Sequence, residues 1–259
     1  MKMAFSKPTT DATEQQLLFS HFRSAGYNGL QLKAGQYREY IAQPERFLDQ
    51  WGDDASALAS GLITGGLLDE AGIADLRALF TFAQSVGSER IVFCHAQPRE
   101  GLSHADIQGY AHILSDLGKE AQQHGVVLSL HHHYNQPVMY RQDFAVFFDA
   151  VSDQSVKLTI DTAHLVKSGI DDIGGVIREY RAVLDNMHIK DIARNEFKVL
   201  GKGTIDFAPV FAALHDIGYQ GWLCADEESG DDLTGAMETC ARFLTKNCSE
   251  SPAFRRGDE

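Results

Sequence analysis

The sequence predicts an α/β protein that folds as a single (β/α)8 TIM barrel. Short β-type runs alternate with amphipathic stretches of helical period along the whole chain of 259 residues. No linker or low-complexity tract divides the chain, and barrels of about 250 residues commonly form one domain. A doubly wound open sheet is the alternative, but no GxGxxG turn follows the first strand. We therefore expect residues 1–259 to form one barrel domain.

Eight segments have the length and composition of buried strands, and each precedes a helical pattern such as ATEQQLLFSHFRSAG or DFAVFFDAV. Four helical patterns end at a glycine, which suits a left-handed helix cap. These glycines are Gly26, Gly87, Gly125 and Gly218. The predicted strands are Met3–Ser6, Gly29–Leu32, Ser60–Thr64, Arg90–Cys94, Val126–His131, Val156–Asp161, Leu184–Ile189 and Gly221–Asp226.

The charge and composition of the chain limit the kinds of partner that we expect it to bind. The net charge is −13 at pH 7, whereas a surface that binds nucleic-acid phosphates needs clustered lysine and arginine. No stretch approaches the roughly 18 apolar residues of a membrane span. The N-terminal MKMAFSKPTTDATEQQ has no apolar signal core, so we expect a cytoplasmic protein with neither a nucleic-acid nor a membrane partner. Assembly into a homo-oligomer stays open.

Three consecutive histidines close the fifth predicted strand, in the stretch LSLHHHYNQP. Side chains alternate along a strand, so His131 and His133 share the face of Ser129, whereas His132 shares the face of two leucines. The leucines suit the outside of the barrel, where helices pack. We therefore expect His131 and His133 to face the barrel axis and His132 to be structural.

The next three strands also end in polar residues on one face. A barrel carries its site at the C-terminal ends of its strands, and mixed carboxylate and imidazole ligands suit Mn²⁺, Co²⁺, Fe²⁺, Zn²⁺ or Mg²⁺. A single Asp or His after a strand more often caps the next helix, but the same inward parity at four successive strand ends favours a metal site. Besides His131, the inward residues are Asp161 on the sixth strand, His188 and Lys190 on the seventh, and Asp226 and Glu228 on the eighth.

Two further stretches are read as structural. Glu227 points away from the inward face of the eighth strand, so we expect it to be a solvated charge. The glycine-rich GKGTIDF, residues 201 to 207, lacks the Walker spacing and is expected to be a turn before the next helix.

Four motifs in order, LTIDTAHLVKSGID, NMHIKD, LGKGTIDF and GYQGWLCADEE, resemble the xylose-isomerase-like TIM-barrel superfamily of sugar phosphate isomerases and epimerases. The resemblance covers nearly the whole chain. It implies a divalent metal held by a Glu, an Asp, a His and a second Glu from the last four strands, of which Asp161 and His188 match the Asp and the His. It also implies that His164, three residues after the Asp, and Arg194, six residues after the metal His, bind substrate.

The sequence departs from that family pattern at both glutamates. His131 stands where the family often has the first Glu, and Asp226 replaces the second, unless Glu228 reaches in instead. Those glutamates are also the acid–base pair of the family's epimerases, so a two-glutamate mechanism is in doubt whereas a metal site is retained. The predicted metal ligands are therefore His131, Asp161, His188 and Asp226.

The predicted activity is that of a metal-dependent isomerase or epimerase, which moves a proton next to the carbonyl of a sugar or sugar derivative. No dinucleotide fingerprint, Walker loop or GxSxG elbow is present, so no organic cofactor is expected. The catalytic candidates are His133 and Glu228, with Asp226, as bases and Lys190 as the charge that stabilises an oxyanion. A dehydratase of a keto-inositol or keto-polyol is the alternative. A DNA endonuclease and a non-catalytic sugar-binding protein fit less well.

Overall fold

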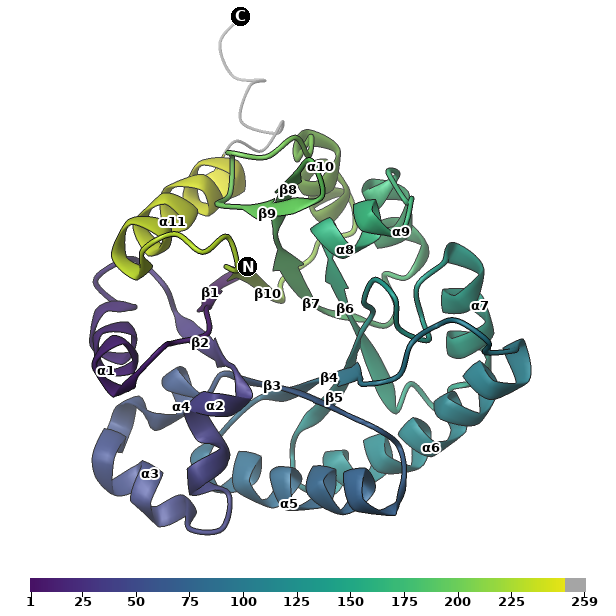
Figure 1. The fold of residues 1–259 in the computed structure, drawn as a ribbon, viewed down its shortest axis with the longest axis horizontal. Coiled ribbons are helices and arrows are strands. Elements are labelled where there is room, and N and C mark those ends of the chain that lie inside the picture. Colours follow the sequence, from purple (N-terminus) through teal and green to yellow (C-terminus); the bar gives the residue numbers. More distant parts are fainter. Residues whose placement is uncertain (250–259) are drawn as a thin grey trace, which may run out of the picture.

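A computed structural model of the chain describes residues 1–249. Within this range eight parallel strands form a closed barrel in the order β1-β10-β7-β6-β5-β4-β3-β2. Figure 1 shows the ring of strands with the helices around it. The predicted (β/α)8 barrel is confirmed. The barrel strands are β1 (Lys2–Ser6), β2 (Gly29–Leu32), β3 (Gly61–Gly66), β4 (Arg90–His95), β5 (Val127–His131), β6 (Val156–Asp161), β7 (Leu184–Ile189) and β10 (Trp222–Asp226).

Every predicted strand corresponds to one of these strands, with ends that differ by no more than two residues. The last ten residues of the predicted domain, 250–259, lie outside the described residues, so the assignment of the whole chain to one domain stays a prediction.

Capping residues mark the ends of several helices. The carboxylate of Asp69 accepts a hydrogen bond from the Gly72 amide and caps α5, and Gly87 ends this helix with φ of 73°. The other three predicted cap glycines also have positive φ. No helix among residues 1–249 is both long and apolar enough to cross a bilayer. The helices are α1 (Ala12–His21), α2 (Ala34–Tyr37), η1 (Arg38–Tyr40), α3 (Pro44–Trp51), η2 (Gly52–Asp54), α4 (Ala55–Leu58), α5 (Glu70–Val86), α6 (His104–Gln123), α7 (Arg141–Ala150), α8 (Thr162–Lys167), α9 (Ile173–Glu179), α10 (Ala208–Asp216) and α11 (Leu233–Ser249).

A small antiparallel hairpin follows β7 and was not predicted from the sequence. Its strands, β8 (Asp191–Ala193) and β9 (Glu196–Lys198), are too short to produce a clear alternation of apolar and polar residues. The following GKG segment is a turn, as expected. It wraps around the Asp191 carboxylate, which accepts hydrogen bonds from the amides of Gly201 at 3.1 Å and Gly203 at 2.8 Å. A Cβ on Gly203 would lie 2.1 Å from Asp191 Oδ1, so this position requires glycine.

The alternation of side chains along β5 places apolar residues outside and polar residues inside the barrel. Leu128 and Leu130 are buried in the apolar layer beneath the helices. On the other face, Ser129 Oγ lies 2.7 Å from Thr159 Oγ1 of β6 in a buried hydrogen bond. Asn186 of β7 extends this contact, because its Nδ2 donates to Thr159 Oγ1 at 3.4 Å. These hydrogen bonds form a buried polar layer inside the barrel, below the C-terminal ends of the strands.

Candidate metal centre and active site

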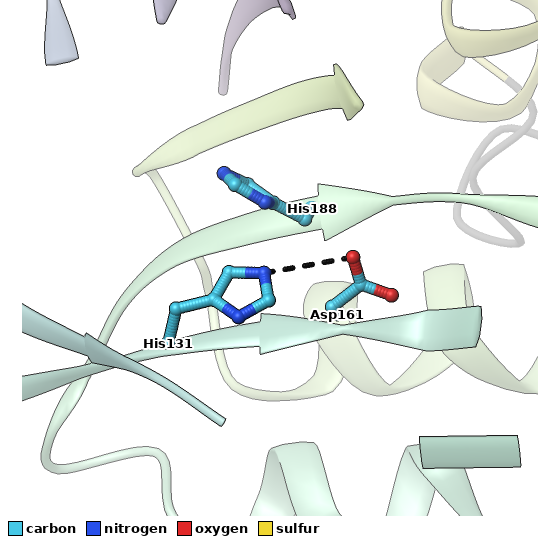
Figure 2. A group of neighbouring side chains, drawn as sticks. All are labelled: His131, Asp161 and His188. Atoms are coloured by element: carbon cyan, nitrogen blue, oxygen red, sulfur yellow. Dashed lines mark ion pairs between the residues drawn. The ribbon is translucent and has the colours of Figure 1, made fainter. Parts of the chain in front are cut away.

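Three of the four predicted metal ligands lie together at the ends of β5, β6 and β7. Asp161 is the register partner of His188, and His131 is the partner of Thr159. One potential ligand atom from each of His131, Asp161 and His188 lies within 4.8 Å of the other two, and all three residues are buried. Figure 2 shows these side chains next to one another, with the contact from His131 Nε2 to Asp161 Oδ2 at 3.6 Å drawn as a dashed line.

The two oxygens of Asp161 have different surroundings. Oδ1 accepts a hydrogen bond from the His164 amide at 2.9 Å and caps α8. Oδ2 is buried and has no hydrogen-bond partner among the described residues, although Lys190 Nζ lies 3.6 Å away. Helix capping, the ordinary explanation for an Asp after a strand, therefore accounts for one oxygen and leaves the other available to a cation.

His188 is held in a tautomer that suits a metal ligand. Its Nε2 lies 2.8 Å from Gln31 Oε1, which can only accept, so Nε2 carries the proton. Gln31 is itself fixed by two amide hydrogen bonds with Asn186, at 2.8 and 3.0 Å. The other ring nitrogen, Nδ1, is buried without a hydrogen-bond partner in residues 1–249 and keeps its lone pair. Metal-binding histidines commonly donate their second N–H to a carbonyl in this way.

These donors fit a divalent transition metal. Ligand atoms about 2.1 Å from one ion lie roughly 3 to 4 Å apart. The candidate atoms lie within 4.8 Å of one another, so small shifts of the side chains would bring them to that spacing. Two imidazoles and one carboxylate suit Zn²⁺, Fe²⁺, Co²⁺ or Mn²⁺. Without a metal, burial disfavours a charge on His131, but the neighbouring Cys94 and Asp161 outweigh burial and raise the pKa of His131 to about 10. A metal bound at this position would displace that proton.

Asp226, the fourth predicted ligand, lies beside this group and is paired with lysines. Its Oδ1 accepts from Lys33 Nζ at 2.6 Å, and its Oδ2 lies 2.6 Å from Lys190 Nζ. Oδ2 is also 3.6 Å from His188 Nδ1. Both oxygens are thus engaged by ammonium groups, and the metal-ligand role of Asp226 stays a prediction.

Lysines and carboxylates make one side of the site strongly charged. Glu228 accepts hydrogen bonds from Lys33 at 2.9 Å and from Lys190 at 2.8 Å. Burial alone would lower the pKa of both lysines, but the attraction of Asp226 and Glu228 outweighs it and raises that pKa above its ordinary value. Lys33 was missed in the sequence, although it follows β2 with the same parity as the inward Gln31.

His133 and His164 form a neutral pair on another side of the site. Their ring centroids are 3.6 Å apart. His133 Nδ1 lies 2.7 Å from the Tyr134 carbonyl oxygen and must donate to it, so Nε2 keeps a lone pair. Burial lowers the pKa of His133 to about 4 and also lowers that of His164, so both rings are uncharged at neutral pH.

The structure also shows where His132, Arg194 and Glu227 lie. His132 points outward, packs its ring 5.1 Å from Phe144 and accepts a hydrogen bond from the Asp161 amide at 2.9 Å, in keeping with a structural role. Arg194 is exposed at the tip of the β8–β9 hairpin, so its substrate contact stays a prediction. The expectation that Glu227 is solvated was wrong. This residue is 3% exposed, because its carboxylate turns into the following loop and accepts a hydrogen bond from the Ser229 amide at 2.7 Å.

The hairpin also places an aromatic ring over the site that was not predicted. The Phe197 ring centroid lies 4.6 Å from Lys190 Nζ, and the His164 ring is 5.5 Å away in an edge-on arrangement. Lys167 Nζ lies 4.9 Å from the same ring. In the sequence, the only available indication was an aromatic residue shortly after the HIKD motif.

Comparison with known proteins identifies relatives along most of the chain. A family profile described as xylose isomerase-like TIM barrel matches residues 19–247. The rhizopine catabolism protein MocC of Rhizobium meliloti is 27% identical over 250 residues, which cover 83% of this chain and 75% of MocC. Inosose dehydratase of Clostridium perfringens is 29% identical over 144 residues, which cover 48% of each chain. This match thus spans about half the length of the dehydratase.

Solved structures with low sequence identity share the fold. The IOLI protein with a binding zinc atom has a TM-score of 0.77 at 17% identity, over 96% of this chain and 98% of IOLI. The 3-keto-D-glucoside 4-epimerase YcjR of E. coli has a TM-score of 0.75 at 18% identity, over 95% of this chain and 99% of YcjR. At these identities the similarity establishes the barrel architecture.

Proposed function

This chain belongs to the xylose isomerase-like TIM-barrel family, and we propose that it is a metal-dependent enzyme that moves a proton next to the carbonyl of a sugar or keto-polyol. The observation that carries this proposal is the buried group of His131, Asp161 and His188, at the rim where barrels carry their sites. One nitrogen or oxygen atom of each of these side chains has no hydrogen-bond partner among residues 1–249. A divalent ion held there would polarise the substrate carbonyl and stabilise negative charge on its oxygen.

Lys190 is proposed to stabilise the same developing charge. Its ammonium lies 3.6 Å from Asp161 Oδ2 and is fixed by Asp226 and Glu228, at 2.6 and 2.8 Å. A charge that is already oriented in a buried site stabilises an oxyanion without further reorganisation. The site therefore combines a fixed cation with a metal-binding group.

His133 is the proposed base. Its Nε2 lone pair is left free by the hydrogen bond at Nδ1, and the neighbouring His164 ring, tilted by 36° to that of His133, restricts the ring orientation. Glu228 is the second candidate, because it is ionised and its side chain is 33% exposed at the mouth of the site. Its oxygens already accept hydrogen bonds from two lysines, which reduces their basicity, as burial reduces that of His133.

The proton transfer can lead to two outcomes. In an isomerase or epimerase, our first candidate, the proton returns to carbon. In a dehydratase, the second candidate, a hydroxyl next to the reacting carbon leaves as water. The similarity to inosose dehydratase supports dehydration, as does the replacement of the two glutamates, because epimerisation needs acid–base groups on both faces of the sugar.

Incubation of the metal-loaded protein with ketoses and inososes in D₂O tests the proposal. Deuterium on carbon in the recovered sugar would support isomerisation or epimerisation, and an unsaturated product would support dehydration. Asp161→Asn, which keeps the size of the side chain and removes its charge, serves as the inactive control. A metal-loaded protein that exchanges no carbon-bound proton and releases no water with any of these compounds would contradict the proposal.

A further inference from the structure

A second recess adjoins the metal-binding group at the ends of β4 and β5. It is a cavity of about 310 Å³. That volume is at the lower end of the range for small-molecule pockets, roughly 300 Å³ and above. Two loops form its walls, and His133, the proposed base, belongs to one of them. The lining residues are His95, Ala96, Gln97, Pro98, His133, Tyr134, Asn135 and Gln136.

Among residues 1–249, no Asp, Glu, Lys or Arg lines this cavity. Burial lowers the pKa of His95 to about 4, so this ring is neutral at pH 7. Binding of a phosphate group generally depends on Arg, Lys or a helix N-terminus. The ammonium identified beside the cavity, Lys167 Nζ, lies 5.3 Å from the Tyr134 ring and is not among the lining residues. The chemistry of the walls is that of amides, imidazoles and a phenol, which exchange hydrogen bonds with hydroxyl groups.

Two polar atoms of the cavity residues are buried and unpaired among residues 1–249. His95 is only 3% exposed, and its Nε2 has no hydrogen-bond partner. Gln136 Oε1 is likewise buried and has no hydrogen-bond partner among these residues. By contrast, Gln97 Oε1 accepts a hydrogen bond from Tyr110 at 2.7 Å. Buried polar groups are nearly always paired, so two side chains with unpaired atoms, on two different loops of one cavity, are free to turn toward a ligand.

The cavity is connected to the reacting centre through His133. The ring of His133 lies 5.8 Å from that of His131, between centroids, and also lines the cavity. A substrate whose carbonyl is at the metal-binding group would therefore extend past His133 toward His95 and Gln136.

We propose that this cavity is the subsite for the uncharged, hydroxyl-bearing part of the substrate, with hydrogen bonds from hydroxyl groups to the side chains of His95 and Gln136. The substrate is then an unphosphorylated polyol or sugar. This inference rests on the proposed function, because it places the carbonyl of the same molecule at the metal-binding group.

Calorimetric titration of the metal-loaded protein with D-fructose, 2-keto-myo-inositol and D-fructose 6-phosphate tests the subsite. We expect at least one of the two neutral compounds to bind, and D-fructose 6-phosphate to bind no more tightly than D-fructose. His95→Phe and Gln136→Leu should each raise the Kd of the bound neutral compound about tenfold. Gln122→Leu, the same change at an exposed position of α6, should leave Kd unchanged. Gln136 is only partly buried, so its variant keeps the test valid if His95→Phe fails to fold.

An unchanged Kd in both cavity variants, tighter binding of D-fructose 6-phosphate, or no binding of either neutral compound would each overturn the subsite. The proposed function fails in a different way. In that case the neutral compounds bind and the cavity variants weaken them, but no carbon-bound proton exchanges and no water is lost.

Discussion

Ionisable side chains on the two sides of the barrel rim differ in charge state. On the side of β2, β7 and β10, buried lysines and carboxylates face each other and all remain charged. On the side of β4 and β5, the buried His95 and the half-buried His133 form no ion pair with any carboxylate in residues 1–249, and desolvation lowers the pKa of both rings. Desolvation disfavours the charged form on both sides, so the presence of a partner decides the charge state.

This difference suggests that the two sides suit different parts of a substrate. The charged side suits the end of a substrate where negative charge develops, because its ammonium groups are already oriented. The neutral side suits hydroxyl groups, which hydrogen-bond to amides and imidazoles without the desolvation cost of an ion. The candidate metal ligands His131, Asp161 and His188 lie between the two sides, and the following predictions test each part.

The largest effect is expected from removal of the metal-binding group. Asp161→Ala and His188→Ala should lower metal affinity at least a hundredfold and abolish proton exchange, because each removes a donor atom. His132→Ala should keep a stoichiometric metal, since its ring faces Phe144 outside the barrel. Metal content after dialysis, measured by mass spectrometry, compares the three variants. Equal retention in all three would mean that the metal binds elsewhere.

A large effect on turnover is expected on the charged side. Lys190→Met should lower kcat by roughly 10²- to 10⁴-fold while metal remains bound, because the oriented ammonium is lost. Lys167→Met is the matched control, since Lys167 lies a similar distance from the same Phe197 ring but belongs to none of the ion pairs with Asp226 or Glu228. Steady-state kinetics on both metal-loaded variants measure the difference. Similar losses in the two would assign the effect to the aromatic contact.

An intermediate effect is expected on the neutral side, in the pH dependence of stability. The pKa of His95 is about 4 in the folded protein and about 6.5 in the unfolded chain. Below pH 6.5 the unfolded chain takes up a proton that the folded protein does not, so stability falls as the pH drops toward 4. Between pH 7 and 5, the wild type should lose about 2 kcal/mol more than His95→Asn. Urea unfolding at the two pH values measures this difference. Parallel losses would mean that His95 takes up a proton as readily in the folded protein as in the unfolded chain.

The smallest effect is expected at the hairpin tip. Arg194→Ala should raise KM by less than about fivefold and leave kcat unchanged, because an exposed ionic contact contributes roughly 0 to 1 kcal/mol. Kinetics at low and high salt provide the measurement, since an exposed contact weakens with salt. A tenfold rise in KM or a loss of kcat would show instead that the hairpin closes onto the substrate.

The sequence by itself was sufficient for the barrel and for the inward direction of its polar residues. Strand and helix periods are local properties, so the eight strands and the alternation along β5 could be predicted from neighbouring residues. Because parallel strands in a barrel end at one rim, His131, Asp161 and His188 could also be predicted to lie together.

Only the tertiary structure decided which of these groups are paired. Lys33, 193 residues away in the chain, reaches Asp226 because β1 lies between β2 and β10 in the closed ring. Glu227 is buried because a loop folds back over it, and the neutral cavity exists because two separate loops meet beside His133. Local periodicity determines the face of a side chain, whereas its partner depends on ring closure, register and the reach of long side chains. Those contacts are made between residues far apart in sequence, and they set the charge of every group in the site.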